Sequence, residues 1–424
     1  MFSKKFEDFG FEVRITPSTS FVLQGTKNKL YLLFEILVEE KQEKTTAKNP
    51  FNLVLVLDRS GSMKGQKLDF AKKAASEVIG NLRSLDTLHF VIYDTEVETL
   101  FEKGDLKQKE LLQQKVKQIS AGNSTYLSGG LVQGADLVKK HFSKEKSNRI
   151  FIFSDGLANV GLKRLEELTD LAKQINRKGI NVSSFGIGED FDEDVMQNLA
   201  IHGQGDYFFI DQADKIPDIV DEAIEGLLGL VLSNVELNIK PGKGVEIIKV
   251  FAYPDDIILG DVRETETRQV LVELDIDPIL ALSSNILTFT LNYRSVSDIM
   301  TDKKFSETLT IPFTSNEDDI VKENDEVLLT KHLLETAEKE LEISRLIEQF
   351  DFEKALDGQK QLVLFLKSLK LQDKNGLLAD KISFLEKALK KLETGEYSMS
   401  RKMYRYSSYS SYYSKKRDMI NSKK

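Results

Sequence analysis

The feature that most constrains the fold is an alternation, between residue 51 and about residue 230, of short apolar runs with segments of helical spacing. The helical segments space their apolar residues three, four and seven apart, as in Leu68, Ala71, Ala74, Ala75, Val78, Ile79 and Leu82. Uninterrupted apolar runs such as Phe51 to Leu57 are typical of strands buried on both faces, with crossover helices between them. We therefore predict a doubly wound, mostly parallel α/β sheet over residues 50–230.

The segments on either side of this region have a different rhythm. Residues 11–41 and 231–315 alternate apolar with polar positions and contain no helical spacing, as in Val235, Leu237 and Ile239. Such alternation is typical of antiparallel strands with one buried face. A domain that starts with a strand and ends with a helix brings its two ends close together. We therefore predict that both segments build one β-sandwich, with the α/β domain inserted in its sequence.

The C-terminal part divides into two stretches. Residues 318–393 have helical spacing and predict a small α-helical region. Residues 396–424 are basic, rich in Ser and Tyr, and poor in aliphatic residues, which predicts a disordered tail. As an alternative, this tail is an arm that contacts anionic surfaces on an acidic protein, a lipid or RNA.

Composition excludes several classes of protein. The 424 residues are 41% hydrophobic and 30% charged, which is typical of a soluble globular protein. The chain has no cysteine, so disulfides and thiolate metal sites are excluded. We find no secretory signal and no run of about 18 apolar residues, so we expect a cytoplasmic protein without a transmembrane segment. The net charge of −9 argues against binding of nucleic acid by the main body.

Oxygen-bearing side chains follow two of the apolar runs. The first run leads into Asp58-Arg59-Ser60-Gly61-Ser62-Met63, and the run Ile150 to Phe153 leads into Ser154-Asp155-Gly156. If these strands are neighbours, both carboxylates face one crevice at the carboxyl ends of the sheet. The polar loop Gly122 to Leu131 opens a helix between them and offers Thr125. Carboxylates and hydroxyls without His or Cys suit a hard divalent cation, with magnesium favoured over calcium.

These three parts resemble the complete metal-ion-dependent adhesion site of von Willebrand factor type A (VWA) domains. The resemblance covers residues 50–230, and the flanking layout is similar to stand-alone bacterial proteins with this domain. It implies a Rossmann-like fold and a site that holds Mg²⁺, with Mn²⁺ or Ca²⁺ as alternatives. The implied metal-binding residues are Asp58, Ser60, Ser62, Thr125 and Asp155. The serines would bind directly, Thr125 when a ligand is present, and both Asp residues largely through water.

The resemblance implies a non-enzymatic adaptor that captures a Glu or Asp of a protein partner through the bound cation. A magnesium-dependent phosphohydrolase is the alternative, since a bound cation activates water. The chain contains no HExxH zinc motif, no phosphate-binding loop and no Gly-x-Ser-x-Gly elbow. Two other interpretations of the Asp58 segment explain less: an EF-hand loop, which Met63 disfavours, and simple capping of the next helix, which leaves Thr125 and Asp155 unexplained.

Overall fold

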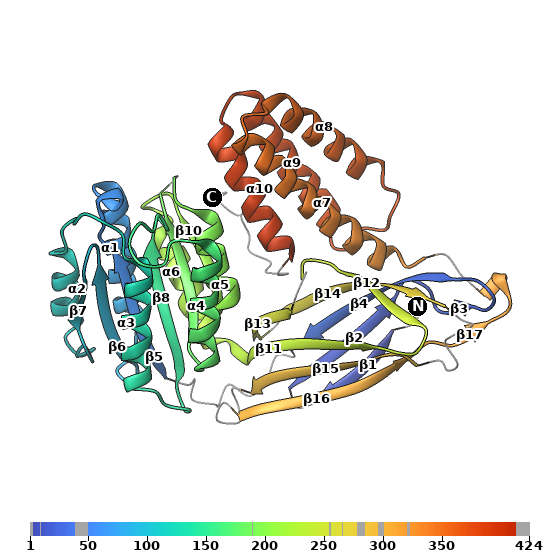
Figure 1. Ribbon diagram of the computed structural model, residues 1–424, viewed down its shortest axis with the longest axis horizontal. Coiled ribbons are helices and arrows are strands. Elements are labelled where there is room, and N and C mark those ends of the chain that lie inside the picture. Colours follow the sequence, from blue (N-terminus) through green and yellow to red (C-terminus); the bar gives the residue numbers. More distant parts are fainter. Residues whose placement is uncertain are drawn as a thin grey trace. The chain divides into compact units, whose positions relative to one another are not determined.

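The computed structural model describes residues 3–8, 10–38, 50–188, 190–253, 256–264, 266–277, 285–295, 301–319 and 323–412. The chain forms two compact units. One comprises Met1–Glu40, Glu236–Asn292 and Lys304–Lys424, and the other comprises Lys41–Val235 and Tyr293–Lys303. A parallel-rich sheet, antiparallel sheets and C-terminal helices are all present (Figure 1), which confirms the predicted fold class. No helix in the described ranges is both long and apolar enough to cross a membrane.

The α/β unit is built on a six-stranded sheet in the order β10-β9-β8-β5-β6-β7. All neighbouring strands are parallel except β6 and β7. The strands are β5 (Phe51–Asp58), β6 (Thr87–Tyr93), β7 (Val97–Phe101), β8 (Ser147–Ser154), β9 (Asn181–Ile187) and β10 (Gln204–Ile210). The first strand of the unit, β5, therefore pairs directly with β8, with Leu57 opposite Phe153. This pairing places Asp58, the last residue of β5, and Asp155, which directly follows β8, at the ends of neighbouring strands.

Helices cover both faces of this sheet (Figure 1). On one face, apolar residues of α1 (Gln66–Asn81), α2 (Lys109–Lys117) and α6 (Ile216–Leu228) share a core with alternate strand residues such as Leu53, Leu55 and Leu57. The opposite face is covered by α3 (Leu127–Lys140), α4 (Leu165–Arg177) and α5 (Glu193–His202). Burial of every residue from Phe51 to Asp58 explains why the strand lacks polar alternation.

Two antiparallel sheets lie mostly in the other unit. One sheet has the order β1-β2-β4-β14-β12 and another β13-β11-β15-β16. Their strands are β1 (Lys4–Asp8), β2 (Phe11–Pro17), β4 (Asn28–Leu37), β11 (Leu230–Pro241), β12 (Val245–Val250), β13 (Ile257–Arg263), β14 (Thr267–Ile276), β15 (Asn285–Ser295) and β16 (Thr301–Thr310). The short β3 (Val22–Leu23) and β17 (Phe313–Thr314) pair in parallel.

Strands from before and after the α/β segment belong to the same sheet. β4 pairs with β14 along its full length, from Leu37 opposite Thr267 to Asn28 opposite Ile276. Phe289 on β15 joins the two sheets, because its ring lies 5.3 Å from that of Phe6 and 5.8 Å from that of Phe34. Pairing of strands so distant in sequence means that the α/β segment interrupts the sequence of a single β-unit.

Four helices complete this unit, namely α7 (Asp325–Glu348), α8 (Phe352–Ser368), α9 (Leu377–Glu393) and α10 (Tyr397–Tyr412). Side chains cap the first two, because Asn324 accepts a hydrogen bond from the Glu326 backbone and Asp351 accepts one from Lys354. The helices bury a shared aliphatic core that includes Leu362, Leu385 and Leu392. Val327 and Leu334 on α7 also pack against Tyr31, Leu33 and Leu271 of the β-strands and against Phe251, which directly follows β12.

Helix α10 corrects the prediction of a disordered tail over residues 396–424. Residues 397–412 form a helix that packs against α7 and α9, and residues 413–424 lie outside the described part of the chain. Polar contacts hold much of this helix: Ser408 donates to the Ala337 carbonyl at 3.0 Å and Arg405 pairs with Glu348 at 2.7 Å. Tyr404, fully buried, supplies apolar area. Low aliphatic content therefore misled the prediction, since hydroxyls and rings can cover a polar helix face.

Candidate metal centre

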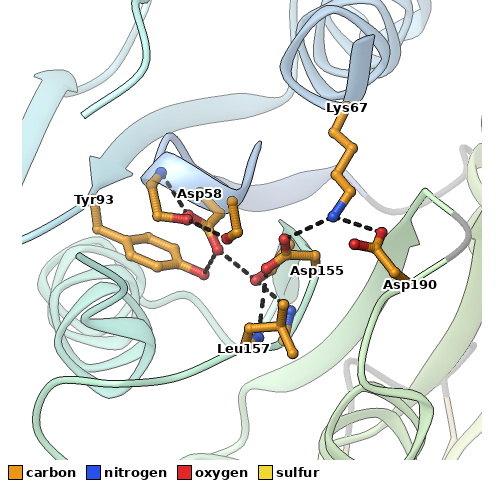
Figure 2. Close-up of polar contacts among 10 residues, drawn as sticks. Asp58, Lys67, Tyr93, Asp155, Leu157 and Asp190 are labelled. Carbon is orange, nitrogen blue, oxygen red and sulfur yellow. Dashed lines mark hydrogen bonds and ion pairs between the residues drawn. The ribbon is translucent and has the colours of Figure 1, made fainter. Parts of the chain in front are cut away.

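Asp58 is the last residue of β5, and its carboxylate is held by three neighbours. Its Oδ1 accepts a hydrogen bond from the Ser60 backbone N–H at 2.8 Å. Its Oδ2 accepts from the Ser154 hydroxyl at 2.6 Å and from the Tyr93 hydroxyl at 3.3 Å. Tyr93 and Ser154 are the last residues of β6 and β8, the strands on either side of β5. Three adjacent strand ends thus fix the orientation of one fully buried carboxylate (Figure 2).

The two serines lie in a tight turn directly after Asp58. Residues Gly61–Met63 form a single 3₁₀ turn, closed by a bond from the Met63 N–H to the Ser60 carbonyl at 3.1 Å. This turn, rather than an extended segment with alternating side chains, groups the serines, because the Ser60 and Ser62 hydroxyls lie 3.1 Å apart. Ser60 is fully buried whereas Ser62 is exposed to solvent.

Thr125 lies on a loop that is hydrogen-bonded to the turn after Asp58. The Gly61 N–H donates to the Asn123 carbonyl and the Gly122 N–H donates to the Arg59 carbonyl, both at 2.6 Å. The two loops approach each other closely at this point. Gly122 leaves the room for it, because a Cβ there would lie 1.8 Å from the Asp94 carboxylate. Thr125 itself is 2% exposed. The structure therefore brings its loop against Ser60 and Ser62 through the backbone.

Asp155 follows β8 and is as deeply buried as Asp58. Its Oδ2 pairs with the Lys67 ammonium at 3.1 Å, and its Oδ1 accepts from the Leu157 N–H at 3.4 Å. Lys67 also pairs with Asp190 at 2.6 Å, so one ammonium serves two carboxylates (Figure 2). All five predicted residues thus come from three loops at the carboxyl ends of the strands, which is where open α/β sheets bind their ligands.

The cluster of Asp58, Asp155 and Asp190 contains more carboxylates than the single ammonium of Lys67 can neutralise. Burial raises the pKa of Asp58 to about 6, and the charge of Asp155 adds to the rise, while hydrogen bonds from Ser154 and Ser60 oppose it. Burial also tends to lower the pKa of Lys67, but its contacts with Asp190 and Asp155 outweigh burial and raise it. Lys67 therefore stays charged and occupied by two acids. The Asp58 carboxylate is left with neutral hydrogen-bond donors alone, which favours binding of a further cation.

The donor set fits a hard divalent cation. Asp58, Ser60, Ser62, Thr125 and Asp155 offer carboxylate and hydroxyl oxygens, the ligand type that magnesium and calcium prefer. The set contains no nitrogen or sulfur ligand, so it does not favour zinc or copper. Within the described residues no group of three or more His, Cys, Asp or Glu side chains could hold a metal. Any site here therefore depends on the hydroxyls as much as on the acids.

Three contributing residues escaped the sequence reasoning. Tyr93 and Ser154 are each the last residue of a strand, but their contacts with Asp58 depend on strand order, which the sequence does not state. Lys67 did carry a signal. It lies in the first turn of α1, where a positive charge is opposed by the helix dipole. A lysine at such a position calls for an acidic partner, and Asp155 and Asp190 supply it.

Comparison with known proteins places the α/β unit in a family. Residues 52–222 match the model of the von Willebrand factor type A domain, so the chain contains a VWA domain. Uncharacterized protein sll0103 of Synechocystis sp. is 24% identical over 263 residues, covering 58% of this chain and 62% of that protein. Inter-alpha-trypsin inhibitor heavy chain H3 of Rattus norvegicus is 26% identical over 224 residues, covering 51% and 24%. The chain thus spans under two thirds of these relatives.

Two solved structures share the fold over nearly the whole chain. The ArnB paralog VWA2 from Sulfolobus acidocaldarius has a TM-score of 0.64 at 20% identity, covering 94% of this chain and 99% of that one. A von Willebrand factor type A protein from Catenulispora acidiphila has a TM-score of 0.67 at 16% identity, covering 92% and 91%. At this level of identity the likeness concerns the fold and not the function.

Proposed function

We propose that the VWA domain of this chain is a metal-dependent, non-enzymatic protein-binding module. In this proposal Asp58, Ser60, Ser62, Thr125 and Asp155 hold a divalent cation, for which magnesium is the best candidate. A cation bound there would leave a coordination position for a Glu or Asp of a protein partner. The observation that carries the proposal is the burial of the Asp58 and Asp155 carboxylates at neighbouring strand ends, where the Lys67 ammonium pairs with Asp155 and with the exposed Asp190 but Asp58 is bonded to neutral donors.

The protein's own residues prepare the site for this task. Tyr93 and Ser154 hold Asp58 in one orientation, so little ordering is needed when a cation binds. Neutral hydroxyls from Ser60 and Ser62 contribute oxygen without charge. A cation held by few charges keeps a strong attraction for one more carboxylate, and this is the property that a carboxylate-binding adaptor needs.

The alternative phosphohydrolase activity has less support. A hydrolase of this kind needs a general base that can reach a metal-bound water. Among the described residues, Asp58 and Asp155 bond to Ser60, Tyr93, Ser154, Lys67 and Leu157, and none of these partners is a histidine. Lys67 is a poor base because its pKa is raised.

Calorimetric titration and affinity capture test the proposal. Magnesium should bind the wild-type protein, and the Ser60→Ala variant should bind it at least about tenfold more weakly. Ser84→Ala is the matched control, because Ser84 is exposed and lies between α1 and β6, away from the site. Protein partners captured from the native cell with magnesium should be lost in chelator and with Ser60→Ala but kept with Ser84→Ala.

Two outcomes would argue against the proposal. If Ser60→Ala binds magnesium as tightly as the wild type, the assigned residues do not form the site. If magnesium supports turnover of p-nitrophenyl phosphate that Ser60→Ala abolishes, the enzymatic alternative is favoured over the adaptor.

A further inference from the structure

Three leucines are exposed in the segment that follows Asp155 and leads into α4. Leu157 is 41% exposed, and Leu162 and Leu165, the first residue of α4, are each 37% exposed. Single exposed leucines are common and need no explanation. Three within nine consecutive residues are different, because each is more than a third exposed. We call Leu157, Leu162 and Leu165 the leucine rim.

The leucine rim is carried by a fixed loop. The N–H groups of Asn159 and Val160 both donate to the Thr125 carbonyl, at 3.1 and 3.2 Å. The Asn159 side chain accepts from the Thr125 N–H at 2.8 Å, and the Leu162 N–H donates to the Ser128 hydroxyl at 3.1 Å. The loop is thus bonded at four points to Thr125 and Ser128. A preordered surface binds a partner at low entropic cost.

Glycine at position 161 is part of this arrangement. Its φ is +72°, a region that disfavours other residues, and a Cβ there would lie 2.4 Å from the Tyr126 ring. The loop therefore packs directly on Tyr126 between Val160 and Leu162. This packing turns the backbone at one point and keeps Leu162 at the surface rather than in the core.

The leucine rim adjoins the residues assigned to the cation. The Leu157 N–H contacts the Asp155 carboxylate at 3.4 Å, and Figure 2 shows the two side by side. A carboxylate that reached a cation on Asp155 and Asp58 would bring its neighbouring side chains past Leu157. Two exposed lysines, Lys64 in the turn after Ser62 and Lys163 next to Leu162, add positive charge to the loops that carry Ser62 and Leu157, whereas the acidic Glu166 and Glu167 come after Leu165, in α4. Charge and apolar area together suit an acidic segment with aliphatic residues.

We propose that the leucine rim is a docking surface that selects protein segments carrying an aliphatic side chain within two positions of the captured Glu or Asp. This inference rests on the proposed function and adds a partner chemistry to it. The cation supplies the attraction for the carboxylate, which most proteins can offer. The leucines discriminate among such carboxylates, because burying them stabilises only those complexes in which an apolar side chain meets them.

A membrane surface is the other occupant that exposed leucines suggest, and the structure favours a protein. Residues 156–165, which carry the leucine rim, include no aromatic residue, and the first turn of α4 adds the acidic Glu166 and Glu167, so the surrounding charge is mixed rather than basic. Aromatic residues and basic polar faces are what interfacial membrane binding uses.

A bead-displayed peptide library with one fixed central Glu and three random residues on each side tests the inference. Fluorescently labelled full-length protein is screened in magnesium and again in chelator. Peptides retained by the wild type in magnesium alone should carry Leu, Ile, Val, Met or Phe within two positions of the Glu. The double variant Leu162→Ser/Leu165→Ser, which leaves the Asp155 contact of Leu157 untouched, should bind the best of them roughly tenfold more weakly, as loss of an apolar anchor requires.

Controls separate this inference from the proposed function. Leu85→Ser, at a leucine that is 68% exposed before β6, should bind like the wild type. The double variant should keep wild-type affinity for magnesium and for a peptide whose Glu is flanked by serines.

Three outcomes would overturn the inference. The first is that the retained peptides show no preference for aliphatic residues near the Glu, or that the double variant binds the best peptide as tightly as the wild type does. The second is pelleting with phosphatidylserine-containing vesicles that the double variant loses while peptide binding is unchanged, which assigns the rim to lipid. The third is that the wild type binds no peptide of the library in a way that depends on magnesium. This last outcome rejects the proposed function itself.

Discussion

Two buried acidic clusters in this chain are neutralised in different ways. In the VWA domain, Asp58 and Asp155 are fully buried, and one ammonium, that of Lys67, is shared between Asp155 and Asp190. In the C-terminal helices, Glu340 is also fully buried, but it has Lys381 to itself at 2.8 Å. Lys381 also donates to the hydroxyls of Ser407 and Ser411 at 2.8 and 3.1 Å.

The difference distinguishes the proposed binding site from a structural contact. The helical cluster matches one charge with one opposite charge, and its serines satisfy the remaining donors of the ammonium. The VWA cluster has more carboxylates than cations, and its serines serve Asp58 and each other. Burial alone therefore does not identify a functional acid. An excess of buried negative charge beside neutral hydroxyls is the better indicator.

The largest expected effect is on the helical cluster. Lys381→Met leaves Glu340 buried without its counter-charge, and breaking a buried pair in this way costs about 3–5 kcal/mol of unfolding free energy. Urea unfolding of the full chain, with hydrogen exchange across α10 to assign the transition, measures this loss. Lys360→Met is the matched control, because its pair with Glu393 is about half exposed and should contribute less than about 1 kcal/mol. Equal stability of Lys381→Met and the wild type would contradict a closed pair.

The second prediction concerns Asp58. Asp58→Asn keeps the shape of the side chain but removes its charge, so magnesium should no longer stabilise the protein. At one hundred times the dissociation constant, magnesium should raise the wild-type unfolding free energy by about 2.7 kcal/mol. In chelator the variant should be at least as stable as the wild type, since a buried charge has been removed. Asp170→Asn, an exposed site on α4, is the control and should behave like the wild type.

The contrary result is that magnesium stabilises Asp58→Asn as much as the wild type. In that case Asp58 does not bind the cation, and the two clusters do not differ in function. The same thermal or urea unfolding curves, recorded with and without magnesium, decide the matter. Asp58 would then be a structural acid, as Glu340 is.

Much of this comparison was accessible from the sequence, for a physical reason. The apolar run Phe51 to Leu57 and the helical spacing from Leu68 to Leu82 each report local burial, so the α/β unit was predicted correctly. The approach of Asp58 and Asp155 follows from adjacent parallel strands, which the structure contains. Their role as metal ligands stays a prediction.

The contacts that escaped prediction depend on distant partners. Tyr93 reaches Asp58 across 35 positions of sequence, and Lys67 reaches Asp155 across 88. Helix α10 docks on α7 through Arg405 and Ser344, which are 61 positions apart. Hydropathy predicts none of these contacts, because a polar side chain has the same hydropathy value whether it faces water or another polar side chain. A Ser- and Tyr-rich segment is therefore read as solvated until its partner surface is known.

The third prediction is a pH dependence of the helical cluster. Burial raises the pKa of Glu340 above its usual range, with Lys381 and Ser407 opposing the rise. An acid whose pKa is higher in the folded state contributes most stability below its unfolded pKa and loses that contribution as the pH rises through the folded pKa. The difference in unfolding free energy between the wild type and Glu340→Gln should therefore fall with rising pH, by at most about 1.4 kcal/mol per pH unit.

Urea unfolding between pH 4.5 and 8 measures this difference. A difference that is constant with pH would mean that Glu340 has the same pKa in both states, and that Lys381 fully offsets the cost of its burial.

The smallest expected effect tests whether the two lysines have opposite roles. Lys381 completes its cluster, whereas Lys67 occupies an acid that a divalent cation would also use. Lys67→Met should therefore strengthen magnesium binding three- to tenfold, or about 1 kcal/mol, because a nearby like charge is removed in a partly screened site. Lys64→Met, an exposed lysine on the same turn, should change the affinity less. Calorimetric titration at fixed ionic strength compares the two. Weaker binding by Lys67→Met would show that Lys67 orients Asp155 for the cation, as Lys381 orients Glu340, and the two clusters would then share one design.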